Sequence, residues 1–245
     1  MSTDDSGTSS PFAKRGFIAA AAVVGVIVAL GLFVLVMNLV SPPSTAPEPE
    51  PEPKPTTTSP VQSGDDASVC GLEGFETESS LEQAPDVEWE LVGTVAVPVD
   101  STVGPGVVDD DGFRSCFAHT AEGALYSAIN YVALSSDPRL QPKIWQLFEE
   151  GPVRDNAKEE SESGSGMPSS ARLQVAGFKI MSYTGERAVI DVAWQVSSPA
   201  SGIMSMPVEL VWEEGDWYLA TTDTGLPYAP SQIENLGGYI PWSGA

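Results

Sequence analysis

The sequence contains very few histidines and cysteines, the residues that most often bind zinc. His119 is the only histidine, and Cys70 and Cys116 are the only cysteines, among 245 residues. One imidazole and two cysteines that are expected to form a disulfide cannot supply the ligands of a zinc site. No Gly-rich segment stands between a strand and a helix with the spacing of a phosphate or dinucleotide motif. We therefore expect no metal and no cofactor.

Basic residues are also scarce. Lys and Arg number 11 against 34 Asp and Glu, and the chain carries a formal net charge of −23 at pH 7. The segment from residue 69 onward holds 8 of the basic and 27 of the acidic residues, a net charge of −19. Because such a surface repels polyanions, the charge argues against nucleic acid and anionic lipid as direct ligands of that segment. Solubility outside the cell explains the same charge.

One long hydrophobic run lies near the N-terminus. Residues 17–40 contain no charged side chain. A helix of this length would extend about 36 Å, enough to cross a hydrocarbon core of about 30 Å. Lys14 and Arg15 precede the run, whereas the next basic residue after it is Lys54. The positive-inside rule then predicts a single-pass plasma-membrane protein, with residues 1–16 in the cytoplasm and the C-terminal domain outside it.

A cleaved signal peptide is the alternative to this anchor. Its apolar core spans about 7 to 15 residues and ends in a small-x-small cleavage site. The run at 17–40 is longer, and the nearest such site, residues 44–46, is followed by Pro47, which disfavours cleavage. We therefore predict a retained signal-anchor helix. Its small residues at every fourth position permit close helix–helix contact, although chance also explains this spacing in a membrane helix. These residues are Ala21, Gly25 and Ala29.

Residues 41–68 have the composition of a linker. Pro alternates with Glu from Pro47 to Pro53. Pro-rich chain favours an extended conformation of about 3.1 Å per residue, so the linker would hold the following domain up to roughly 80 Å from the membrane. It is either a spacer suited to a thick bacterial envelope or a disordered tether.

Both cysteines lie beyond this linker. In an oxidising compartment an even number of cysteines predicts a disulfide, here between Cys70 and Cys116. It would join the first residues of the domain to the start of its first helix. Two separate buried thiols are the alternative.

The next residues show a strand pattern and then helical patterns. Thr120 is the predicted N-cap of a first helix in which apolar residues repeat at three and four positions. The predicted elements are a β-rich region at 87–99 and helices at 121–134 and 142–150, with 153–163 as a candidate third helix.

From residue 171 onward the pattern is that of strands. Apolar and polar residues alternate, and the connections are short, which predicts hairpins in an antiparallel meander. The predicted strands are 172–183, 188–196, 204–212 and 217–220. We therefore predict an α+β fold in which two or three helices pack on a curved antiparallel sheet of about four strands.

These elements predict an extracytoplasmic domain at 69–225 and a C-terminal tail at 226–245. The tail contains aromatic and aliphatic residues and few charges. It either folds back on the domain or offers an apolar strip to a partner. The candidate residues of that strip are Tyr239, Ile240 and Trp242.

Two segments carry a resemblance to known families. Helices followed by a meander that ends in the hairpin 210–219 resemble the cone-shaped nuclear-transport-factor-like (cystatin-like) superfamily. The segments 112–113 and 117–124 are similar to the helix opening of an uncharacterised group of actinobacterial membrane proteins, many of them encoded beside conjugation genes. Those relatives commonly have proline where this chain has Ala121. The likeness covers residues 85–225.

The resemblance has implications for function. A single span, a Pro-rich linker and a domain of this kind are similar to the bitopic assembly subunits of type IV secretion and conjugation machines. This likeness implies a structural or adaptor role, with contacts between copies and with neighbouring proteins. The superfamily also includes isomerases and dehydratases, which supplies an alternative.

Candidate catalytic residues are few. His119 stands three residues after Cys116, but a disulfide would remove the thiolate, and a position beside Thr120 favours a capping or packing role. Residues 109–111 are acidic but lack the spacing of a calcium loop, so they predict a surface loop. Asp191 is a candidate base only if a pocket exists between the helices and the sheet. We expect no catalytic residues and no enzyme activity.

The sequence therefore predicts a membrane-anchored extracytoplasmic interaction domain that acts as a structural or adaptor subunit of an envelope assembly. Conjugation or secretion is the candidate system. The expected partners are the membrane, through one span, proteins of an envelope complex, and further copies of the chain. The alternatives are an exported small-ligand-binding or isomerase-like domain and a wall-associated spacer protein.

Overall fold

The computed structural model describes residues 67–162, 172–197, 202–223 and 225–244. The predicted cytoplasmic segment, the predicted membrane helix with Ala21, Gly25 and Ala29, and most of the predicted linker lie outside these ranges. Within the described ranges, no helix is both long and apolar enough to cross a membrane.

The β-rich region at 87–99 forms a hairpin. Strand β1 (Glu88–Val92) pairs antiparallel with β2 (Val95–Val99), and Gly93 takes a φ of 60° at the turn between them. A second two-stranded ribbon follows, in which β3 (Val107–Val108) pairs with β4 (Arg114–Ser115). The hairpin was not anticipated because both of its strands share one β-rich composition and only Gly93 and Thr94 separate them.

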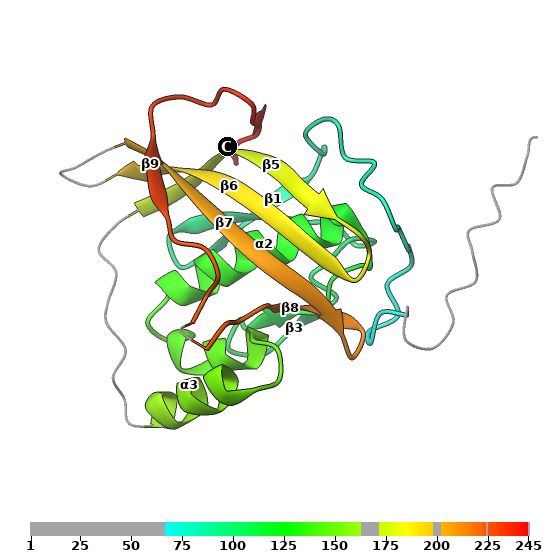
Figure 1. The fold of residues 1–245 in the computed structure, drawn as a ribbon, viewed down its shortest axis with the longest axis vertical. Helices are drawn as coiled ribbons and strands as arrows, with labels where there is room; N and C mark the ends of the chain where they lie inside the picture. The colour runs from blue at the N-terminus through cyan, green and yellow to red at the C-terminus, as the bar shows by residue number, and fades with distance from the viewer. Residues whose placement is uncertain (1–66, 163–171, 198–201, 224, 245) are drawn as a thin grey trace, which may run out of the picture. The chain divides into compact units, whose positions relative to one another are not determined.

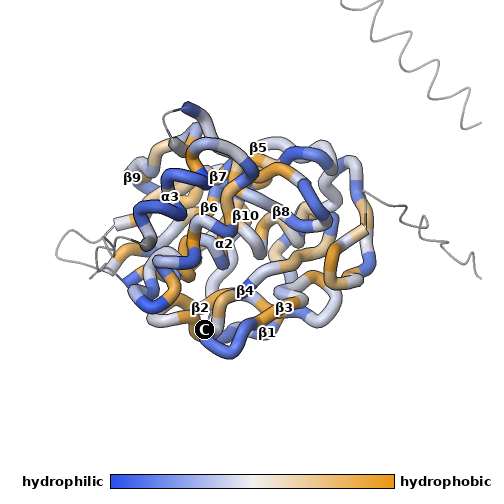
Figure 2. The backbone as a smooth tube through the Cα atoms, turned by 90° about the horizontal axis from the view of Figure 1, so that it is seen from below, coloured by the Kyte–Doolittle hydropathy of each residue, from blue (hydrophilic) through white to orange (hydrophobic). Residues whose placement is uncertain are grey.

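The predicted first helix is confirmed as α2 (Ala121–Ser136). The Thr120 hydroxyl caps it by accepting a hydrogen bond from the Gly123 backbone nitrogen at 3.0 Å. Gly123 is required here, because a Cβ at that position would collide with the carbonyl oxygen of Ala118. The segment after α2 forms a 3-10 helix, η3 (Gln141–Leu147), and the candidate third helix is α3 (Pro152–Glu162). Figure 2 shows α3 as a hydrophilic segment.

The predicted antiparallel meander is confirmed. It consists of β5 (Arg172–Tyr183), β6 (Arg187–Ser197), β7 (Gly202–Glu213) and β8 (Asp216–Leu219), which pair in that order. The register of β5 on β6 shifts twice, and such bulges bend a sheet. Figure 1 shows β5, β6 and β7 crossing over α2. The fold class is therefore α+β, with three helices in the described residues and a mostly antiparallel sheet.

The sheet has six strands rather than about four, because the C-terminal tail supplies two more. Strand β9 (Ser231–Ile233) pairs with β7, and β10 (Ile240–Pro241) pairs with β5 (Figure 1). Gly177 allows the close approach of β10, since a Cβ there would lie 2.8 Å from the Ile240 carbonyl oxygen. Such short strands carry no periodic signal of their own, so the sequence pattern gave no sign of them.

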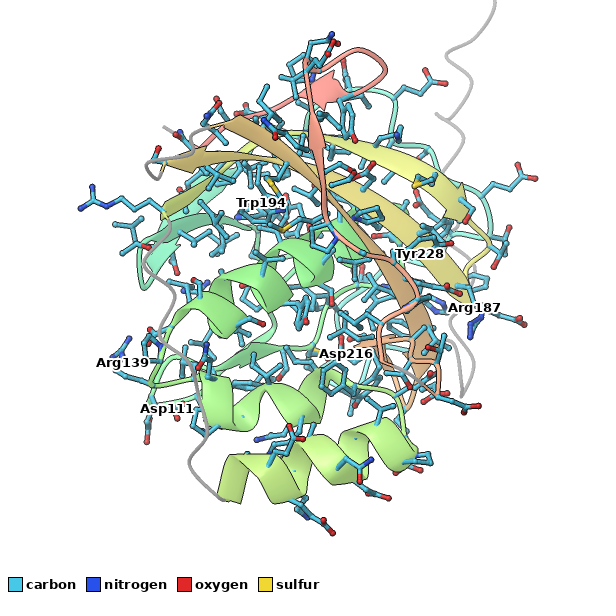
Figure 3. All side chains as sticks on the ribbon, turned by 60° about the vertical axis from the view of Figure 1, so that its left-hand side comes forward. Asp111, Arg139, Arg187, Trp194, Asp216 and Tyr228 are labelled. Atoms are coloured by element: carbon cyan, nitrogen blue, oxygen red, sulfur yellow. A yellow bond between two sulfur atoms is a disulfide. The ribbon has the colours of Figure 1, made fainter. Side chains whose placement is uncertain are left out.

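Side chains fill the space between α2 and the sheet. One face of β6 carries Ile190 and Trp194, and α2 carries Leu125 and Ile129, all of which are fully buried. Figure 3 shows Trp194 between the sheet and α2. Asp191 lies on the other face of β6, because successive strand residues point to opposite faces. The interior is therefore a packed core.

The tail folds back onto the domain. Trp242 is 7% exposed, and its ring lies 4.8 Å from that of Trp89 and 5.4 Å from that of Phe178. Its indole nitrogen donates to the Pro85 carbonyl oxygen at 3.1 Å. Of the two alternatives for the tail, the structure shows the folded-back one, and the Trp242 side chain is not available as a surface strip. The region that folds as one unit thus extends past residue 225, to residue 244.

Candidate functional site at the tether attachment

The segment that follows the linker is joined covalently to the domain. Cys70 and Cys116 form a disulfide with an S–S distance of 2.04 Å, which confirms the predicted pairing. The Val69 backbone nitrogen also donates to the Gly215 carbonyl oxygen at 2.9 Å. The attachment of residues 67–70 to the domain therefore combines one covalent bond with a backbone hydrogen bond to the turn between β7 and β8.

A buried aspartate holds the second cysteine in place. Cys116 has a φ of 63°, a left-handed conformation that is costly for a residue with a Cβ. One carboxylate oxygen of Asp216 accepts from the Cys116 backbone nitrogen at 2.6 Å. The other accepts from Phe117 at 2.9 Å and from Trp217 at 2.8 Å. These three bonds stabilise the strained turn, and Figure 3 shows Asp216 inside the domain.

Burial changes the acidity of this aspartate. Removal from water raises the pKa of Asp216 from its ordinary value of 3.8 to about 6, although the three backbone donors act in the opposite direction. The folded state therefore binds a proton between these two pH values where the unfolded state does not. By linkage, stability falls as the pH rises from about 4 to 6, by about 3 kcal/mol, and is constant above that range as far as this group is concerned.

Asp216→Asn tests this expectation. The side chain of Asn does not titrate, so we expect the unfolding free energy of the variant to change less between pH 4 and pH 6 than that of the unsubstituted chain. Urea denaturation at half-unit pH intervals measures both curves. Parallel curves would show that Asp216 does not contribute to the pH dependence. Because both proteins share every other titrating group, the difference isolates this one.

His119 packs beside the attachment and has a structural role. It is 2% exposed, and its Nε2 donates to the Gly185 carbonyl oxygen at 2.7 Å. Its ring stacks on that of Trp212 at 3.7 Å and meets Trp217 edge-on at 5.6 Å. Since Cys116 is in a disulfide, no Cys/His nucleophilic pair forms. This geometry agrees with the packing role expected from the sequence.

An open groove lies beside the attachment and is lined by both Val69 and Gly215. It has a volume of about 990 Å³, and its walls come from the segment after the linker, from the β7–β8 hairpin and from the β5–β6 turn. Trp212 and His119 form part of its lining. The charged residues along it are Glu150, Glu186, Arg187, Glu213 and Glu214. The groove is therefore acidic, with an aromatic wall.

Comparison with known families identifies the chain at the level of its domain. Residues 49–241 match the family described as a domain of unknown function, DUF8175. The chain belongs to this family. The matched range includes both cysteines of the attachment and extends through β10. No curated protein and no solved structure matches the chain.

The acidic loop of this DUF8175 domain is held by a lysine. The Lys143 Nζ lies 2.5 Å from Asp111 and 3.6 Å from Asp109, and its ammonium stands over the Phe113 ring. Hydrogen bonding to Lys143 lowers the pKa of Asp111. The positive charge beside the loop thus comes from a side chain of η3. This arrangement fits the surface loop that its spacing predicted.

Asp191 joins the tail to the sheet. Its carboxylate accepts from Ser205 at 2.8 Å and from the Tyr239 hydroxyl at 2.6 Å, and it pairs with Lys179 at 3.3 Å. The alternation of apolar and polar residues along β6 indicated that Asp191 lies on the outer face of the sheet. It did not indicate the hydrogen-bond partner of Asp191, because Tyr239 is 48 residues away. Asp216 was missed for a similar reason. The sequence predicted the hairpin turn that contains Asp216. It did not indicate that the Asp216 carboxylate accepts hydrogen bonds from the backbone nitrogens of residues 116 and 117.

Proposed function

We propose that this DUF8175 protein is a membrane-anchored extracytoplasmic interaction domain, which acts as a structural or adaptor subunit of an envelope assembly. The observation that carries the proposal is the Cys70–Cys116 disulfide. Disulfides persist in oxidising compartments, in agreement with a domain outside the cytoplasm. This one also lies where the Pro-rich linker joins the domain, so a pull on the linker would be resisted by a covalent bond.

The packed interior supports a function at the surface. A small-ligand-binding or isomerase-like domain of this fold would need a deep pocket between the helices and the sheet. Leu125, Ile129, Ile190 and Trp194 occupy that space and are fully buried. Contacts with partners must then involve the outside of the domain, where the acidic groove at the attachment is one available surface.

The resemblance to the nuclear-transport-factor-like superfamily is part of the same proposal. A long helix, α2, against a bent antiparallel sheet supports it. We further propose a conjugation or type IV secretion apparatus as the assembly, on the likeness of the sequence to bitopic subunits of those machines. Contacts between copies through the membrane helix, at Ala21, Gly25 and Ala29, belong to this proposal.

Topology is tested first. We expect alkaline phosphatase fused after residue 68 to be active and the same enzyme fused after residue 16 to be inactive, because phosphatase folds only outside the cytoplasm. Labelled full-length protein should keep its N-terminal tag in the membrane fraction. Activity at position 16, or release of the domain without its tag, would contradict the anchor.

Partners are tested by photo-crosslinking in the host membrane. A photoreactive residue at Glu186 is exposed and lines the acidic groove, whereas one at Glu159, on α3, is exposed and outside the groove lining. We expect Glu186 to crosslink another membrane protein or a second copy, and Glu159 to give less product. If neither position crosslinks and the full-length chain is a monomer in mild detergent, the proposal is wrong.

A further inference from the structure

A second pocket lies between the two small ribbons and shares no lining residue with the acidic groove. It has a volume of about 630 Å³, within the range of small-molecule sites. The β1–β2 hairpin forms one wall and the β3–β4 ribbon with residues 104–105 forms another. Its charged lining residues are Asp86, Glu88, Glu90, Asp100 and Arg114.

Arg114 is an unusual residue for such a wall. Its side chain is 8% exposed, and its Nη2 donates to the Glu90 carboxylate at 2.5 Å. Its Nε and Nη1 are buried and have no hydrogen-bond partner in the part of the chain that the structure describes. A buried donor without an acceptor destabilises the fold, and more so when it is charged. A carboxylate that takes the place of Glu90 at Nη2 can accept from one of these two nitrogens as well, which is the fork geometry of a guanidinium.

Glu90 is the residue that an incoming carboxylate would displace. Its side chain is 55% exposed, so it can leave the guanidinium at little cost in packing. The pair also joins β4 to β1, which places Arg114 at the junction of the two ribbons. A carboxylate entering from the pocket would replace one carboxylate of the chain by another.

The remaining charges of the pocket require positive groups on the same ligand. Four carboxylates against one guanidinium leave a net charge of −3 among the lining residues. A simple anion would be repelled by the four carboxylates, and a simple cation would have no group to pair with Arg114. Hydrogen bonds from Thr102 lower the pKa of Asp100, which keeps this carboxylate ionised. One carboxylate together with ammonium groups in excess satisfies both requirements.

We propose that this pocket binds a basic amino acid or a short peptide that ends in one. The carboxylate of the ligand pairs with Arg114, and its ammonium groups lie among Asp86, Glu88 and Asp100. The inference is independent of the proposed adaptor function, because it concerns another surface and a small ligand. It requires neither a membrane partner nor a particular assembly.

Three dipeptide probes separate the contributions of the charges. Alanyl-lysine has one carboxylate and two ammonium groups, alanyl-lysine amide lacks the carboxylate, and alanyl-norleucine lacks the side-chain ammonium. Isothermal titration of the purified full-length chain in detergent measures all three. We expect alanyl-lysine to bind about tenfold more tightly than either of the others, since a charge-assisted pair is worth about that factor. Equal or tighter binding of the amide, or no binding of any probe at about 10 mM, overturns the proposal.

Substitutions on one strand provide a sharper test. Glu90→Gln weakens the competitor of the ligand carboxylate, so the preference for alanyl-lysine over its amide should rise about threefold. Glu88→Gln lies two residues away and should weaken both probes equally, leaving that preference unchanged. Glu159→Gln, on α3, should change neither. Identical effects of the two strand variants contradict the proposal.

Arg114→Lys completes the set. It keeps the charge but loses the fork, and we expect the preference for alanyl-lysine over its amide to fall to about one. An unchanged preference overturns the role of Arg114. If this buried substitution prevents folding, the comparison of Glu90→Gln with Glu88→Gln remains sufficient, because both of those side chains are exposed.

Discussion

Replacing Cys70 and Cys116 together by alanine is expected to lower the free energy of unfolding by about 4 kcal/mol. The disulfide closes a loop with a sequence separation of 46, and its removal returns the corresponding chain entropy to the unfolded state. For a domain of this size the midpoint of thermal unfolding should fall by about 10 °C. Circular dichroism under non-reducing conditions measures both quantities.

Reduction of the unsubstituted chain is the matched control. Dithiothreitol should lower its stability to that of the double variant and should not affect the variant itself. A stability that is the same with and without the disulfide would show that the hydrogen bonds of Asp216 and Val69 suffice for the attachment. The segment between residues 67 and 75 should also become accessible to proteases in the variant.

Replacing Trp242 by alanine is expected to lower the free energy of unfolding by about 3–5 kcal/mol, the usual cost of deleting a buried aromatic side chain. Its ring packs against those of Trp89 and Phe178, and its indole bonds to Pro85. If the tail were instead a docking strip for a partner, this substitution would leave the isolated chain as stable as before. Urea denaturation distinguishes the two outcomes.

Tyr228→Ala is the matched control in the same tail. Tyr228 is 39% exposed, so its removal should change stability by no more than about 0.5 kcal/mol. A large loss from Tyr228→Ala, or no loss from Trp242→Ala, would contradict the packing of the tail. Because both are aromatic residues of the last 20 positions, the comparison separates burial from composition.

Elements with a clear period were predictable from the sequence. The meander from β5 to β8, helix α2 and its Thr120 cap follow from alternation, from repeats of three and four, and from one capping side chain. The short elements were not predictable. Gly93 divides a continuous β-rich run, and the strands β9 and β10 contain too few residues for a period to appear. These strands exist because longer strands offer them an edge.

The disulfide was predictable for a different reason. The chain has two cysteines, and both follow a segment that predicts export, so chemistry and compartment allow one intramolecular pairing. The partners of Asp216 could not be anticipated in this way. Its carboxylate bonds to a backbone nitrogen 100 residues earlier, and no local pattern marks a backbone group that lies at such a distance.

The sequence by itself determined the longer helices and strands, the acidic surface, the cysteine pairing and the expectation of a tethered domain, because each depends on composition or on local periodicity. Only the tertiary structure decided that the tail belongs to the core and that Asp216 supports the cysteine turn. It alone placed Arg114 beside Glu90 at a pocket with four carboxylates. These features are contacts between distant segments, and they form only when burial of apolar surface brings those segments together.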